Sequence, residues 1–167
     1  MYPTMKRLLA LTLTLVLICA SACAASFTAR SSGKSYFTFN YDASRFSLDS
    51  ESYLYGNAPG RSWFFILYDG KYTIDCGMDD YAELYGVGSN SAQLSNFLCS
   101  VYGASVVEHY TAAGQEFVIL SRGSSYLAAT FLHNRVVYFE VFNMLSGSVD
   151  SAALSALKSA LSGFSAL

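Results

Sequence analysis

Short strand-like segments, separated by tight turn signals, constrain the fold of this chain more than any other feature. Four of them follow one another at residues 106–110, 117–121, 126–132 and 136–144, with Gly114, Arg122-Gly123-Ser124 and His133-Asn134-Arg135 between them. Connections this short join neighbouring antiparallel strands, so we predict an antiparallel meander over residues 106–144.

The first half of the domain carries three more strand patterns. Aromatic residues alternate with polar ones over residues 36–41, and residues 46–48 form a short second strand. Residues 63–68 are a continuous apolar run, followed by Asp69-Gly70 and by an alternating segment to Met78. Asp69 and Gly70 suit the two positive-φ positions of a type I′ turn, so this segment is predicted to be a β-hairpin.

Two segments change to a helical period. In residues 91–103 apolar side chains recur three and four positions apart, and Gly103 can end the helix. Residues 150–162 repeat the pattern, with Ser148 or Asp150 as the N-cap and Gly163 as the stop. Two helices that are apolar along one stripe and a sheet with an aromatic inner face predict an α+β domain, in which a central antiparallel sheet is flanked by two amphipathic helices.

The N-terminal residues read as an export signal. Lys6 and Arg7 precede an apolar run from Leu8 to Ala20, followed by small residues that suit signal peptidase cleavage after Ala24. An alternative is a lipoprotein signal, in which Cys23 is acylated. We therefore expect a signal segment at 1–24, a flexible tether at 25–35 because its residues are small and polar, and one domain at 36–167. The mature chain is expected outside the cytoplasm, secreted or anchored as a lipoprotein.

Charge limits the partners that the mature chain can bind. Without Lys6 and Arg7, eight basic residues remain against twelve acidic ones, a formal charge of −4. Nucleic acid and anionic lipid surfaces need a basic face, so both are excluded as expected partners. Membrane contact is expected only through an N-terminal lipid.

The order of the elements resembles the PsbP-like superfamily. The resemblance is carried by Tyr36-Phe37-Thr38-Phe39-Asn40-Tyr41, by Phe46-Ser47-Leu48, by the mid-chain helix and closing meander, and by Leu161-Ser162-Gly163-Phe164. That superfamily includes an extrinsic photosystem II subunit, a Ran-binding nuclear import factor and many bacterial exported or lipid-anchored proteins. The resemblance implies a central antiparallel sheet flanked by helices and a non-catalytic role in binding or assembly. Its usual Pro-Gly pair between the first two strands is replaced here by Asp42-Ala43-Ser44-Arg45.

Catalytic and metal-binding patterns are weak in this sequence. Cys76 and Cys99, the two cysteines beyond the signal, either pair as a disulfide or pack as small apolar residues. His109 lies in a predicted strand, where its neighbour Glu108 points to the opposite face. The acidic run from Asp69 to Glu83 has no EF-hand spacing and is interpreted as a solvated face rather than a calcium site. We expect no cofactor, no metal and no catalytic residue.

Tyrosine is the one compositional excess that suggests a binding surface, with 13 residues in the chain. Tyrosines give large amphipathic contact area at small entropic cost, although sheets also favour them. The candidate surface combines loop tyrosines with acidic residues: Tyr53, Tyr55, Asp79, Asp80, Tyr81, Glu83 and Tyr85. The leading hypothesis is therefore a non-catalytic binding or assembly module for a protein partner. The alternatives are a hydrolase or thiol enzyme assembled from distant residues, such as Cys76 or His109, and a carrier of a small apolar ligand.

Overall fold

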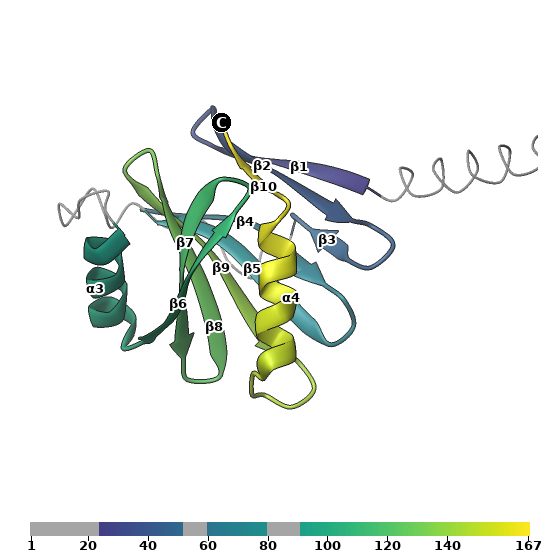
Figure 1. The fold of residues 1–167 in the computed structure, drawn as a ribbon. Helices are drawn as coiled ribbons and strands as arrows, with labels where there is room; N and C mark the ends of the chain where they lie inside the picture. The colour runs from purple at the N-terminus through teal and green to yellow at the C-terminus, as the bar shows by residue number, and fades with distance from the viewer. Residues whose placement is uncertain (1–23, 52–59, 80–90) are drawn as a thin grey trace, which may run out of the picture.

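The computed structural model describes residues 24–51, 60–79 and 91–167, which form two antiparallel sheets and two helices (Figure 1). The larger sheet has seven strands in the order β3-β4-β5-β9-β8-β7-β6, and the smaller has three in the order β1-β2-β10. The strands are β1 Ala24–Ser31, β2 Lys34–Asp42, β3 Ser47–Asp49, β4 Arg61–Tyr68, β5 Tyr72–Asp79, β6 Ser105–Ala112, β7 Gln115–Arg122, β8 Ser125–Leu132, β9 Arg135–Asn143 and β10 Phe164–Ala166. The helices are α3 Ser91–Tyr102 and α4 Ser151–Leu161.

The predicted meander is confirmed. Strands β6, β7, β8 and β9 pair with one another in chain order, each antiparallel to the next. The β8–β9 turn places His133 and Asn134 at φ 50° and 62°, and the β6–β7 turn places Ala113 and Gly114 at 49° and 79°. Two consecutive residues at positive φ are the geometry of a type I′ turn, whose twist matches that of the strands it joins.

The predicted hairpin of β4 and β5 is confirmed, but its turn differs from the prediction. The Asp69 amide donates to the Tyr72 carbonyl over 3.2 Å, so the central residues are Gly70 and Lys71. Only Gly70 has positive φ, at 88°, which is the pattern of a type II′ turn. The Asp69 carboxylate accepts the backbone amides of Lys71 and Tyr72, at 3.0 and 2.7 Å, and this preference shifts the turn by one residue.

The main core lies between the seven-stranded sheet, the small sheet and α4. Phe37 and Phe39 of β2 and Phe164 of β10 are fully or almost fully buried, and all three rings contact Phe139 of β9. The apolar stripe of α4 packs into the same cluster and includes Leu157, which is 0% exposed. The predicted α+β class is therefore confirmed. The predicted single central sheet is confirmed only in part, because strands β1, β2 and β10 form a second sheet.

A second core covers the opposite face of the large sheet. Leu94 and Leu98 of α3 pack with Leu120, Leu127 and Tyr138 of the meander. In Figure 1, α3 lies beside one end of the large sheet, well away from α4. Helix α3 packs mainly against β7 and β6, and Tyr138 of β9 and Trp63 of β4 extend the same cluster.

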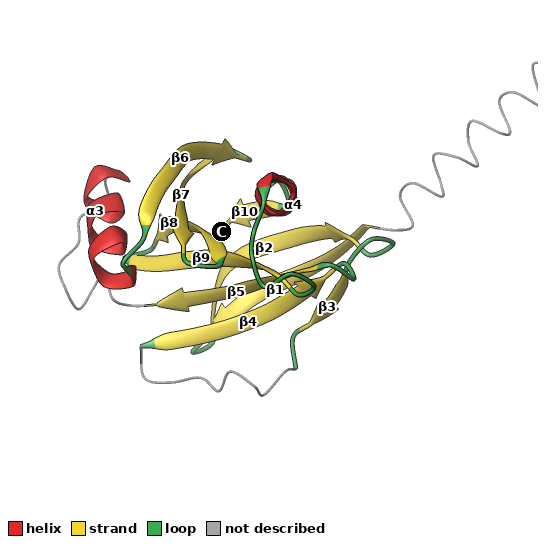
Figure 2. Cartoon of the chain, turned by 90° about the horizontal axis from the view of Figure 1, so that it is seen from below, coloured by secondary structure: helices red, strands yellow, loops and turns green. Residues whose placement is uncertain are grey.

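The predicted tether at 25–35 is wrong, because these residues form β1, a tight turn and the start of β2 (Figure 2). Ser32 and Gly33 have φ values of 50° and 76°, so they close a two-residue hairpin. Ala29 is 0% exposed, and the ring of Phe27 meets that of Phe65 edge to face at 5.1 Å. The small side chain of Ala29, part of the composition that predicted a linker, fits into the core beside β2. Regular structure is therefore already present at Ala24, before the predicted domain start at Tyr36. The predicted signal residues 1–23 lie outside the described residues.

The end of α4 joins the helix to the small sheet. Asp150 is the N-cap, as predicted, and its carboxylate accepts the Ala153 amide at 2.9 Å. Gly163 follows the C-cap and its carbonyl accepts the Asn40 amide at 2.8 Å. A Cβ at position 163 would collide with the Asn40 carbonyl, so glycine is needed here for the close approach of two backbones. Neither helix in the described part of the chain is long and apolar enough to cross a membrane.

Candidate functional site

Most of the predicted Tyr and acidic surface lies outside the described residues. This applies to Tyr53, Tyr55, Asp80, Tyr81, Glu83 and Tyr85, and also to the lipidation candidate Cys23. Asp79 is described, and it is 0% exposed at the end of β5. Its assignment to an exposed binding surface is therefore wrong. Asp75 is also buried, at 5% exposure, so the solvated-face interpretation fails for both residues.

Asp79 is buried because it forms an ion pair with its cross-strand neighbour Arg61. The Arg61 Nε and Nη2 atoms donate to the two carboxylate oxygens over 2.8 and 3.2 Å. The hydroxyl of Tyr102, at the end of α3, donates to the same carboxylate over 3.0 Å. A buried carboxylate requires a paired charge and hydrogen bonds, and a bidentate arginine supplies both. Asp79 thus ties β4, β5 and α3 together.

A second ion pair lies on the same sheet face. Glu140 of β9 is 8% exposed and accepts a hydrogen bond from the Ser125 hydroxyl. The Arg122 Nη1 atom lies 3.5 Å from its carboxylate, and the Arg122 guanidinium lies 5.1 Å from the Tyr102 ring centroid. Tyr102 therefore contacts both ion pairs, one through its hydroxyl and the other through its ring.

Tyr138 lies between the two ion pairs and has a hydroxyl without a partner. The residue is 5% exposed, and among the described residues its hydroxyl is the one buried side-chain polar atom that makes no hydrogen bond. The ring lies over its cross-strand partner Gly77, where any Cβ would collide with the hydroxyl. Trp63 holds the ring from the side, edge to face with centroids 5.6 Å apart. Burial raises the pKa of Tyr138 far above its usual 10, with a smaller contribution from Asp79, so the hydroxyl keeps its proton.

These residues enclose a small polar cavity, which we call the Tyr138 pocket. It has a volume of about 100 Å³ and is lined by Arg61, Trp63, Tyr102, Arg122, Leu127, Tyr138 and Glu140. The lining offers hydrogen-bond donors, a carboxylate acceptor and aromatic walls. Among the described lining residues no nucleophile lies beside a general base.

A larger groove of about 680 Å³ lies where the C-terminal end of α4 meets the small sheet. Its apolar walls include Phe39, Phe46 and Leu67, and its rim includes the Arg45 side chain. This volume is in the range of small-molecule sites. Arg45 lies 3.7 Å from Asp69, and its guanidinium lies 4.7 Å from the Phe46 ring centroid.

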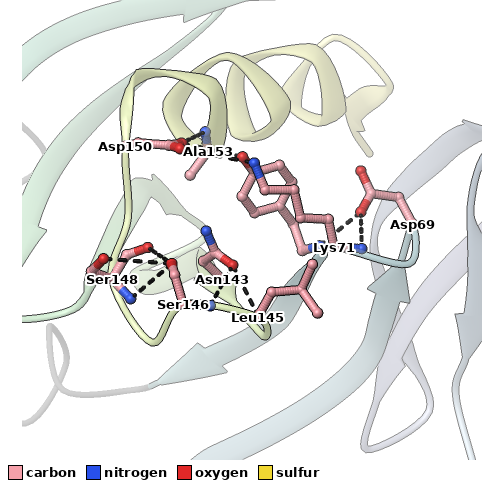
Figure 3. Close-up of polar contacts among 9 residues, drawn as sticks. Asp69, Lys71, Asn143, Leu145, Ser146, Ser148, Asp150 and Ala153 are labelled. Atoms are coloured by element: carbon pink, nitrogen blue, oxygen red, sulfur yellow. Dashed lines mark hydrogen bonds and ion pairs between the residues drawn. The ribbon is translucent and has the colours of Figure 1, made fainter.

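The loop after β9 presents two exposed apolar side chains, which we call the Met144–Leu145 tip. Met144 is 61% and Leu145 75% exposed. The loop is nevertheless held in place, because the Asn143 side-chain oxygen accepts the amides of Leu145 and Ser146 at 3.0 and 3.2 Å (Figure 3). The Met144 amide also donates to the Lys71 carbonyl over 3.0 Å. A rigid tip of large apolar side chains is typical of an interaction site.

The cysteines and histidines lie apart. Cys76 is 0% exposed in the main core, whereas Cys99 packs against the second core, and neither forms a disulfide. The two cores lie on opposite faces of the large sheet, which separates the two thiols. Of the two alternatives for Cys76 and Cys99, the structure therefore agrees with packing as small apolar residues and not with a disulfide. His109 lies 3.1 Å from Glu116, and His133 lies 2.9 Å from the Leu167 carbonyl. Burial also raises the pKa of the Cys76 thiol, which opposes thiolate chemistry. In the described segments no three metal-ligating side chains converge.

Comparison with known proteins rests on structure alone. No protein-family model and no curated protein sequence matches the chain. The solution structure of cyanobacterial PsbP (CyanoP) from Synechocystis sp. PCC 6803 matches it over 87% of this chain and 94% of that one, with a TM-score of 0.51. This chain has a PsbP-like fold.

The PsbP-like fold agrees with the resemblance inferred from the order of the elements. The two sequences are 13% identical, so the comparison establishes the fold and transfers no site residue. The Tyr138 pocket and the Met144–Leu145 tip are features of this chain's own structure. Sequence reasoning missed both of them. Gly77 between Asp75 and Asp79 was the available signal for the pocket, because a glycine inside a strand often marks a close approach by another group.

Proposed function

We propose that this chain is a non-catalytic binding or assembly module that acts on a protein partner outside the cytoplasm. The Met144–Leu145 tip carries the proposal, because exposed apolar side chains on a rigid loop lose little entropy when they are buried by a partner. The PsbP-like fold supports the same role, which is the one implied by the resemblance to that superfamily. His109 and His133 make separate polar contacts with Glu116 and the Leu167 carbonyl, and Cys76 is buried in the main core, so their positions also favour binding over catalysis.

Export is the second part of the proposal. The charged and apolar N-terminal residues support removal of a signal segment after Ala24, or acylation of Cys23. Intact mass of the mature protein separates the two, since only the second adds a diacylglyceryl group. A mass that includes the whole of residues 1–24 without a lipid would contradict both.

Site-specific cross-linking tests the protein-binding role. The full chain would carry a photo-reactive amino acid in place of Leu145, and a control would carry it at Ser159, which is exposed at the far end of α4. In cells, the Leu145 position should give one discrete heavier adduct that the Ser159 position does not give. Identical adduct patterns at both positions would refute the tip as a contact surface.

A carrier of a small apolar ligand is the second candidate function. The observation that favours it is the groove of about 680 Å³ with Phe39, Phe46 and Leu67 in its walls. Native mass spectrometry of protein purified without detergent should then show a bound apolar molecule. Replacement of Ala160, which also lines the groove, by Trp should remove that molecule while leaving the mass of the chain otherwise as calculated.

A further inference from the structure

The Met144–Leu145 tip carries one chemically reactive side chain. Methionine contains a thioether sulfur, which peroxides oxidise to a sulfoxide when they can reach it. Met144 is 61% exposed, whereas Met78, the other methionine among the described residues, is 1% exposed in the main core. Of these two methionines, Met144 is therefore the one that an oxidant in solution can reach.

The space beside Met144 admits an oxidant. The residue borders an open hollow of about 310 Å³, whose lining also includes Thr73, Ser124 and Phe142. Hydrogen peroxide is only slightly larger than water, which occupies about 30 Å³ of liquid, so it has room here. The hydroxyl groups of Thr73 and Ser124 can donate to the oxygen of a sulfoxide, so the oxidised side chain would have polar groups beside it.

The shape of the loop does not depend on the side chain that would be oxidised. The Asn143 side-chain oxygen accepts the amides of Leu145 and Ser146, at 3.0 and 3.2 Å. The Met144 amide donates to the Lys71 carbonyl over 3.0 Å. None of these hydrogen bonds uses the thioether. A sulfoxide would thus change the surface of the tip and leave the hydrogen bonds that hold the loop in place.

Oxidation would change the property on which the proposed role of the tip depends. A thioether is apolar, whereas a sulfoxide is polar and loses hydrogen bonds to water when a partner buries it. We propose that Met144 is an oxidation site, and that oxidation of its sulfur by a peroxide weakens the protein contact made by the tip. This inference rests on the proposed function, which is protein binding through the tip outside the cytoplasm.

The chemical step needs only the peroxide as co-reactant. An electron pair of the Met144 sulfur attacks one oxygen of hydrogen peroxide, and the O–O bond breaks. The attacked oxygen stays on the sulfur and passes its proton to the other oxygen, which leaves as water. The sulfur is thereby oxidised and the peroxide reduced.

Peptide mapping by mass spectrometry tests the oxidation site. The mature protein would be treated with hydrogen peroxide, and the gain of one oxygen atom would be followed separately in the peptides that contain Met144 and Met78. Met144 should be oxidised at least about tenfold faster than Met78, because the Met78 side chain is buried. Equal rates in protein that stays folded by circular dichroism would overturn the site.

Photo-cross-linking measures the effect on the contact. The chain with the photo-reactive amino acid in place of Leu145 would be oxidised, freed of peroxide with catalase and mixed with extract of the native host. The yield of the Leu145 adduct should fall at least about tenfold, the loss expected when a large apolar contact becomes polar. Reduction by a methionine sulfoxide reductase with a dithiol should restore the yield. A yield unchanged by complete oxidation of Met144 would overturn the proposal.

Two methionine variants show which sulfur is responsible. Leucine has nearly the volume of methionine and no sulfur, so either replacement is conservative. Peroxide should leave the adduct yield of Met144→Leu at its own starting value, whereas Met78→Leu should lose the adduct on oxidation as the wild type does. The opposite pattern, or an equal loss in both variants, would mean that oxidation acts elsewhere and would overturn the proposal.

The two proposals fail separately. A Leu145 adduct that survives full oxidation of Met144 would leave the proposed function intact and reject the effect of oxidation. Fast oxidation of Met144 with no Leu145 adduct from the untreated protein would retain the oxidation site and reject the protein contact.

Discussion

Replacement of Gly163 by Ala tests the contact between α4 and the small sheet. The added Cβ would collide with the backbone carbonyl of Asn40, and neither backbone can move away as a flexible side chain would. Separating them breaks the 2.8 Å hydrogen bond from the Asn40 amide to the Gly163 carbonyl, which contributes about 1 kcal/mol. Forced overpacking adds about 1–3 kcal/mol. We expect Gly163→Ala to lower the free energy of unfolding by about 2–4 kcal/mol.

Urea denaturation followed by circular dichroism measures this loss, and Gly114→Ala is the matched control. Gly114 has a φ of 79°, and a methyl group added there would meet no atom within 4 Å, so only backbone strain of about 1 kcal/mol applies. Gly163 is not at positive φ, so its penalty comes from the collision. A Gly163→Ala protein as stable as the wild type, or more stable than Gly114→Ala, would refute the close contact between α4 and β2.

Three further predictions address the site and its surroundings. Asp79→Asn should cost about 2–4 kcal/mol in urea denaturation because it leaves Arg61 without its buried counter-charge, whereas Glu116→Gln at the exposed His109 pair should cost under about 1 kcal/mol; equal losses would contradict the burial of Asp79. Gly77→Ala should displace the Tyr138 ring and change the fluorescence of Trp63, and an unchanged spectrum would argue against their edge-to-face contact. The hydrogen bond from the Ala153 amide lowers the pKa of Asp150 in the folded protein below its usual 3.8. The cap therefore contributes its full stability above pH 3.8, and this contribution is lost as the pH falls through the pKa of Asp150 in the folded protein. Asp150→Asn should therefore flatten the fall in melting temperature below pH 4, and a slope identical to that of the wild type would exclude this contribution.

Apolar periodicity and turn spacing predicted the helices and strands whose pattern is visible within their own segment of the sequence. The stripes around Leu94 and Leu157 became α3 and α4, and the four segments between residues 106 and 144 became the meander. Apart from the largely exposed edge strand β6, each of these elements buries apolar side chains that are already visible in its own sequence. The resemblance to PsbP-like proteins was likewise one of element order, and it is confirmed by the structural match.

Elements that depend on distant partners were not predictable in this way. The small and polar residues of β1 become a strand because they pair with β2, and the short β10 exists because it pairs with the same strand. The burial of Asp79 depends on Arg61, which lies 18 positions earlier in the neighbouring strand. Nothing in the local sequence of Asp79 distinguishes it from a solvated acidic residue. The Tyr138 pocket combines β4, β7, β8, β9 and α3, so only the fold brings its walls together.

Retention of the partner by a tip variant tests the central claim, that this chain binds a protein through the Met144–Leu145 tip. The full chain and a Met144→Ser/Leu145→Ser variant would be isolated from the native host under identical conditions. The protein identified by cross-linking at Leu145 would then be quantified in both preparations by mass spectrometry. We predict retention by the wild type and at least a tenfold loss in the double variant, with the melting temperatures of the two proteins within about 2 °C. Equal retention would contradict the claim.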